Sequence, residues 1–97
     1  MTGTCYLISR TYTKDSNLNL VPTETRREII CEERSLSSSE FHNAKRDGLS
    51  PEIEIVTAKV NYQGEKILEY NGTRYGIYRT YVRGDSIELY CEIKAGI

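Results

Sequence analysis

The chain has 97 residues, of which 28% are charged and 38% hydrophobic, and its formal net charge is -1. This length predicts one domain over residues 1–97 and excludes a large hydrophobic core. The low net charge argues against a protein that coats nucleic acid or an anionic membrane, because both roles need an excess of cationic side chains. Eight tyrosines and one phenylalanine supply all the aromatic rings.

The first half of the chain predicts two strands and then one short helix. Residues 5–12 and 25–34 are rich in β-branched and aromatic residues or carry apolar pairs, whereas residues 14–22 between them are polar and typical of a turn. Ser37, Ser38 and Ser39 precede Glu40 and predict a helix N-terminus. Gly48 predicts its end about ten residues later.

The second half predicts four strands. Ile53, Ile55 and Thr57 alternate with Glu52, Glu54 and Val56, which indicates a strand with one buried and one solvated face. Residues 66–70 and 73–81 flank Asn71 and Gly72, a dipeptide that suits a type I′ hairpin turn. A second tight turn at residues 83–85 leads into the last strand, which is also expected to be half-buried. Its apolar face carries Ile87, Leu89, Cys91 and Ile93, and its other face carries Ser86, Glu88, Tyr90 and Glu92.

These elements predict a mainly β fold, a small antiparallel barrel or sandwich of about six strands. One short α-helix lies between the second and third strands. Cys5, Cys31 and Cys91 are widely spaced and accompany a single histidine, so we expect neither a disulfide framework nor a zinc site. Residues 1–8 have no basic segment and no long apolar run, so we expect a soluble protein without an export signal or a membrane span.

The sequence contains no pattern that indicates an enzyme or a cofactor. His42 lies on the predicted helix without a recognisable nucleophile motif, and Glu52 and Glu54 are expected to be solvated carboxylates with ordinary pKa values. No phosphate-binding glycine loop is present, and the Arg83-Gly84-Asp85 and Asn71-Gly72-Thr73 tripeptides are explained as turns. We therefore expect no catalytic, cofactor-binding or metal-binding residues.

An arginine and tyrosine pattern supports one alternative function. Arg26, Arg27, Lys45, Arg46, Arg74, Arg79 and Arg83 could form a stripe beside Tyr75, Tyr78 and Tyr81, as in an OB-like or SH3-like module that binds nucleic acid. Interleaved glutamates and the net charge weigh against this alternative.

From residue 24 onward the chain resembles the head-closure proteins of tailed bacteriophages, the small head-tail connector or "stopper" subunits. The resemblance is strongest over residues 24–93 and depends on the order and spacing of motifs that are individually weak. These motifs are Glu24-Thr25-Arg26-Arg27-Glu28, Ser39-Glu40-Phe41 with Ala44, Gly48-Leu49-Ser50-Pro51-Glu52, Tyr62 with Gly64 and Glu65, Tyr70-Asn71-Gly72, Tyr75 with Arg79-Thr80-Tyr81, and Ile87-Glu88-Leu89.

The resemblance implies a structural role in the virion neck, after synthesis and assembly in the bacterial host cytoplasm. About a dozen copies would form a ring below the portal and adaptor protein after DNA packaging. The ring would close the exit channel and present a surface to the tail or tail-completion protein. Double-stranded DNA would pass through without sequence-specific binding, and a near-neutral subunit suits such a channel. A neighbouring role, as adaptor or tail-completion protein, is a further alternative.

Within this role, the helix and the tyrosine-rich hairpin are the candidate contacts with other subunits or with the adaptor. Tyrosine suits a face that is wet before docking and buried afterwards, because it combines an apolar ring with a polar tip. The candidate interface residues are Ser39, Glu40, Phe41, Ala44, Tyr75, Tyr78, Arg79 and Tyr81.

Overall fold

The computed structural model describes residues 2–94 and residue 97. Its elements are β1 (Thr2–Lys14), β2 (Leu20–Arg34), α1 (Ser38–Arg46), β3 (Pro51–Ala58), the 3-10 turn η1 (Lys59–Asn61), β4 (Ile67–Tyr70), β5 (Thr73–Arg83) and β6 (Ser86–Glu92). The predicted order of two strands, one helix and four strands is confirmed.

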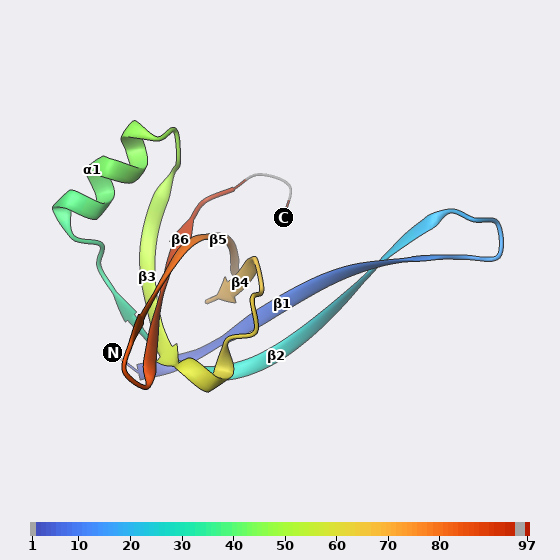
Figure 1. Cartoon of the computed structure of the whole chain (residues 1–97), viewed down its shortest axis with the longest axis horizontal. Coiled ribbons are helices and arrows are strands. Elements are labelled where there is room, and N and C mark those ends of the chain that lie inside the picture. The colour runs from blue at the N-terminus through green and yellow to red at the C-terminus, as the bar shows by residue number, and fades with distance from the viewer. Residues whose placement is uncertain (1, 95–96) are drawn as a thin grey trace.

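The six strands form a closed antiparallel barrel in the order β1-β2-β3-β6-β5-β4 (Figure 1). Two short ladders close it: Tyr6, Leu7 and Ile8 of β1 pair with β4, and Glu32, Glu33 and Arg34 of β2 pair with β3. Closure removes the sheet edges within the barrel. The fold is therefore a barrel and not a sandwich of two sheets.

The core consists of side chains that point into this barrel. Leu7, Ile55, Leu68 and Leu89 are 0 or 1% exposed, and each comes from a different strand. Cys5, Cys31 and Cys91 join them as buried free thiols, as expected for small apolar side chains. Burial raises the pKa of the Cys91 thiol to about 12, so this group stays protonated.

The two predicted hairpin turns adopt the backbone conformations that their sequences favour. Asn71 and Gly72 have φ values of 52° and 78° and connect β4 to β5. Gly84, with a φ of 57°, connects β5 to β6. These positive φ values explain why glycine and asparagine occupy the positions.

The hairpin of β1 and β2 is longer than the sequence predicted. Residues 14–22 were expected to form a turn, but the strands pair as far as Lys14 and Leu20, and the turn covers only residues 15–19. The outer part of this hairpin projects from the barrel on the side away from α1 (Figure 1), and the molecule measures 49 × 29 × 24 Å. Polar composition concealed these strands because both faces of a projecting ribbon contact solvent.

Candidate subunit interface at α1 and β5

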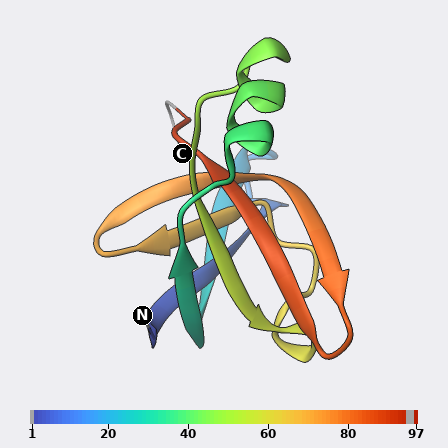
Figure 2. The ribbon, with the colours of Figure 1, turned by 90° about the vertical axis from the view of Figure 1, so that its left-hand side faces the viewer.

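Helix α1 stands beyond the rim of the barrel, beside the segment that leads into β3 (Figure 2). The Ser37 side chain accepts a hydrogen bond of 3.2 Å from the N–H of Glu40, so it caps the helix as predicted. Gly48, with a φ of 85°, ends the helix. Ala44 is the one buried residue of the helix, at 4% exposure.

The carboxylate of Glu40 ties α1 to β5. It accepts a hydrogen bond of 2.8 Å from the Tyr78 hydroxyl and forms an ion pair with Arg79. A register shift between Ile77 and Arg79 places Tyr78 at an irregularity of β5. Burial and the bond to Glu40 raise the pKa of Tyr78, so its hydroxyl remains the donor. The structure thus brings together three residues that the sequence nominated.

The other nominated residues divide into two groups. Ser39, Phe41 and Tyr81 are exposed, and the Arg83 guanidinium lies 5.1 Å from the centre of the Tyr81 ring. Tyr75 is partly buried against the core. Ala44 is buried within this chain at 4% exposure, and its contact with a partner stays a prediction.

The sequence did not predict a polar cluster on the outer face of the barrel, which lies beside the contacts of Glu40 with Tyr78 and Arg79. Glu88 is 5% exposed, and its carboxylate accepts hydrogen bonds of 2.7 Å from the Tyr90 hydroxyl and 2.6 Å from Arg83. These bonds outweigh burial and lower the pKa of Glu88. The guanidinium of Arg79 covers the Tyr90 ring at 4.3 Å. Both faces of β6 are therefore buried, not one.

Glu54 also contradicts its sequence prediction. It was expected to be solvated but is 9% exposed, because Arg34 of β2 and Tyr90 of β6 flank it in the sheet. Burial raises the pKa of Glu54, and the nearby Glu88 raises it further. Arg34 and Arg83 attract its carboxylate but form their ion pairs with other glutamates in the described part of the chain.

Glu54→Gln is expected to stabilise the protein by about 1 kcal/mol at neutral pH, because it removes a buried charge that forms no ion pair with the residues that the structure describes. The pKa of Glu54 in the folded protein lies above its ordinary value of 4.5. The contribution of Glu54 to the free energy of unfolding of the wild type therefore becomes less favourable as the pH rises from the unfolded-state pKa to the folded-state pKa. Urea denaturation between about pH 4 and about pH 8, a range that covers the titration of a carboxyl group with a raised pKa, measures the effect. The exposed Glu52→Gln is the matched control, and equal pH profiles for the two variants would refute the assignment.

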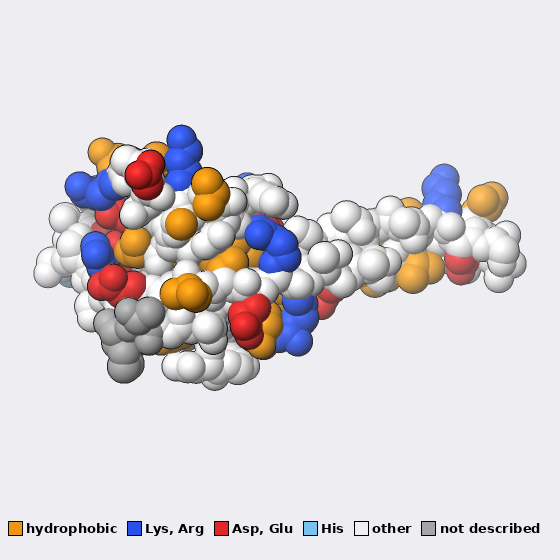
Figure 3. Space-filling model, turned by 90° about the horizontal axis from the view of Figure 1, so that it is seen from below, with side chains coloured by type: hydrophobic (Ala, Val, Ile, Leu, Met, Phe, Trp, Pro, Cys, Tyr) orange, Lys and Arg blue, Asp and Glu red, His pale blue; other side chains and the backbone are white. Residues whose placement is uncertain are grey.

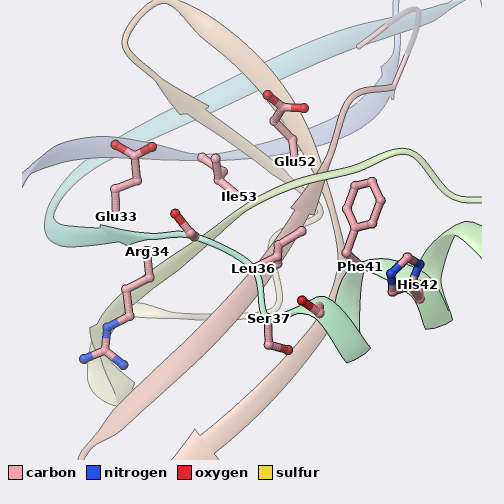
Figure 4. A pocket seen from close by; sticks show the side chains of 10 residues that line it. Glu33, Arg34, Leu36, Ser37, Phe41, His42, Glu52 and Ile53 are labelled. Carbon is pink, nitrogen blue, oxygen red and sulfur yellow. The ribbon is translucent and has the colours of Figure 1, made fainter.

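A groove lies between the first turns of α1 and the start of β3. Its volume is about 540 Å³, and Figure 4 shows Leu36, Phe41 and Ile53 among its lining side chains. Glu33, Arg34, His42, Glu52 and three serines provide its polar part. We call this feature the α1 groove. Two of its four charged or titratable side chains are carboxylates.

Five of the six arginines of the predicted nucleic-acid stripe are engaged by carboxylates, whereas Arg46 donates a hydrogen bond to the side-chain carbonyl of Asn43. Arg26 pairs with Glu69, Arg27 with Glu65, and Arg74 with both Glu24 and Glu69. Arg79 and Arg83 pair with Glu40 and Glu88 as described above. The hydrogen bonds from Arg74 and Arg10 lower the pKa of Glu24 to about 2, so this carboxylate stays charged. The positive charge of these five arginines is locally balanced, which weakens their attraction for a phosphate backbone.

The described residues contain no group of three or more His, Cys, Asp and Glu side chains placed to hold a metal ion. His42 is exposed and packs edge-on against Phe41, with ring centres 5.8 Å apart. No family model and no curated protein sequence matches the chain. Among residues 2–94, no helix has the length and apolar character needed to cross a membrane.

Proposed function

We propose that this chain is a structural subunit of a bacteriophage neck, which assembles as a ring below the portal and adaptor and closes the DNA exit channel after packaging. The observation that carries the proposal is the architecture: a small closed β-barrel with one short helix between the second and third strands. The motif series over residues 24–93 implies this same arrangement, and the motifs around Glu40 and Arg79 meet in space.

The charge distribution supports a channel component that DNA passes without adhesion. A basic lumen would retain the genome through its phosphates, whereas this subunit has a net charge of -1 and pairs its β5 arginines with glutamates. Phe41 on α1 and Tyr81 on β5 remain exposed near the contacts that join these two elements, and both are available to a neighbouring subunit or to the adaptor. The opposite face of the ring would receive the tail or tail-completion protein.

Electron microscopy of virions or reconstituted necks tests the proposal. A ring of this subunit is expected at the portal exit, and its layer distinguishes head closure from the adaptor and tail-completion roles. Portal, major capsid and tail genes are expected beside its gene. A chain found outside the neck would contradict the proposal.

Tyr81→Ala is expected to reduce incorporation into necks about tenfold or more without changing the fold, because an exposed tyrosine at a docking surface acts as an anchor. Tyr81 is 49% exposed, and Val60, which is 85% exposed on η1, offers a control as Val60→Ala. Quantitative mass spectrometry of purified particles measures incorporation, and circular dichroism checks folding. Normal incorporation of Tyr81→Ala would remove this residue from the interface.

The alternative function, an OB-like or SH3-like nucleic-acid-binding module, is tested by titrating labelled single-stranded and double-stranded oligonucleotides at low salt. Electrostatic binding is strongest under these conditions, so its absence there would eliminate the alternative. The paired arginines of β5 lead us to expect no binding. Tight binding would favour the alternative over the neck.

A further inference from the structure

The projecting part of the β1 and β2 hairpin, residues 9–25, has no assigned role, and we call it the arm. It begins where the pairing of Ile8 with Ile67 ends, and it leaves the barrel as a two-stranded ribbon (Figure 1). The space-filling view shows the same segment as a narrow projection (Figure 3). The Asp15 carboxylate organises its end by accepting hydrogen bonds of 2.9 Å from the N–H groups of Asn17 and Asn19. The arm is therefore an ordered element.

The end of the arm exposes apolar side chains far from the core of its own chain. Tyr12, Leu18, Leu20 and Val21 are 59, 75, 66 and 40% exposed. Figure 3 shows hydrophobic side chains at the end of the ribbon. Leu18 also adopts a φ of 63°, a conformation that costs free energy for a residue other than glycine. The register places Tyr12 and Leu20 on one face of the ribbon, with Lys14 paired to Leu20, and Val21 on the opposite face. Exposed apolar side chains and a strained backbone have no benefit in the isolated subunit and point to a docking element.

The charges of the arm indicate a protein partner and not a nucleic acid. Arg10 and Glu24 neutralise each other through an ion pair of 2.7 Å, which leaves Lys14 and Asp15 near the end. A phosphate backbone would need a cationic excess. The arm instead combines exposed apolar side chains with Lys14, while the neighbouring Asp15 carboxylate accepts hydrogen bonds within the turn.

The α1 groove has the complementary properties, and it lies at the other end of the molecule. Leu36, Phe41 and Ile53 supply apolar lining, and the carboxylates of Glu33 and the exposed Glu52 outnumber the one guanidinium, that of Arg34, among the lining side chains. The arm points away from α1 in Figure 1, so it does not reach the groove of its own chain. Two complementary features at opposite ends of one subunit generate a head-to-tail contact between copies.

We propose that the arm of one copy inserts its apolar tip into the α1 groove of a second copy, with Lys14 facing the carboxylate of Glu52. The tip would bury Leu18 and Leu20 against Phe41 and Leu36. The contact stands without the proposed function, and only its closure into a ring rests on that proposal. The contact also gives a use to the strained Leu18 and to the exposed Phe41.

Sedimentation of the purified full chain over a wide concentration range tests the contact. Self-association is expected, and Leu20→Asp is expected to weaken it at least about tenfold. Val60→Asp is the matched control, because Val60 is a similarly exposed apolar residue on η1, outside the arm and the groove. A chain that stays monomeric at every concentration, or equal effects of the two variants, would overturn the proposal.

A charge exchange and a crosslink test the pairing itself. Lys14→Glu and Glu52→Lys should each weaken association, and the double variant should restore it. A photoreactive amino acid at position 20 should crosslink to the segment containing Leu36 and Phe41 of another copy. Crosslinks that join arm to arm, or a double variant no better than the single ones, would refute this docking mode. Neither result affects the neck proposal, which is tested on particles.

Discussion

Leu89→Ala is expected to lower the free energy of unfolding by about 2–5 kcal/mol, the largest effect of any single change we predict. Leu89 lies on β6, between β3 and β5, and is completely buried in the barrel core. Its truncation removes apolar contacts and leaves a cavity that the surrounding strands cannot fill. A domain of this size has a total stability of only about 5–15 kcal/mol, so much of the protein would unfold in mild denaturant.

Urea denaturation followed by circular dichroism measures this effect through the shift of the midpoint. Val60→Ala is the control, because Val60 is 85% exposed and its truncation should cost less than about 0.5 kcal/mol. If Leu89→Ala were as stable as the control, the barrel interior would not be the main source of stability.

Glu65→Ala is expected to destabilise the protein by about 2–4 kcal/mol, because it leaves the partly buried Arg27 guanidinium without its negatively charged partner. The Glu65 side chain is 2% exposed and accepts hydrogen bonds of 2.5 Å from Arg27 and 2.7 Å from the N–H of Gln63. Arg27 also donates a hydrogen bond of 2.5 Å to the backbone carbonyl of Asn61, and the Tyr62 hydroxyl donates a hydrogen bond to the backbone carbonyl of Glu65. The carboxylate therefore fastens the loop after η1 to β2.

The pH dependence gives this prediction a second readout. Burial alone would raise the pKa of Glu65, but the hydrogen bonds from Arg27 and the backbone outweigh it and lower the pKa below 4.5. Such a group stabilises the fold above its unfolded-state pKa, and the benefit is lost as pH falls through the folded-state value. Glu65→Gln should therefore flatten the acid side of the stability profile.

The more exposed pair of Arg26 and Glu69 provides the comparison. The side chains of this pair are 48 and 21% exposed. Breaking it by Arg26→Ala should cost less than about 1 kcal/mol. A double-mutant cycle on Arg27 and Glu65 then isolates the coupling from the loss of packing. A coupling no larger than that of the exposed pair would contradict the role given to Glu65.

Local sequence patterns predicted the strands and turns whose signals are short-range. Asn71 and Gly72 fixed one hairpin through their backbone preferences, and Ser37 and Gly48 marked the ends of α1. Barrel closure has no comparable signal, because the pairing of Tyr6 with Glu69 joins residues far apart in the chain. The sequence therefore left the barrel and the sandwich as alternatives.

The predictions of side-chain exposure were wrong where residues from other strands determine whether a side chain is buried. Glu54 and Glu88 alternate with apolar residues and were assigned to a solvated face. Arg34, Tyr90 and Arg83 cover that face from adjacent strands and from the β5 to β6 hairpin. The arm was missed for the opposite reason, since a ribbon solvated on both sides lacks apolar alternation.

Particle formation without this protein tests the neck role most directly. Deletion of its gene from the phage genome, with expression of the wild-type chain from a plasmid as the control, should give heads that package DNA, then lose it, and carry no tails. Electron microscopy and nuclease sensitivity of the packaged DNA measure both defects. The account predicts DNA-leaking, tailless heads that complementation rescues. Filled, stable, tail-bearing particles from the deletion strain would contradict it.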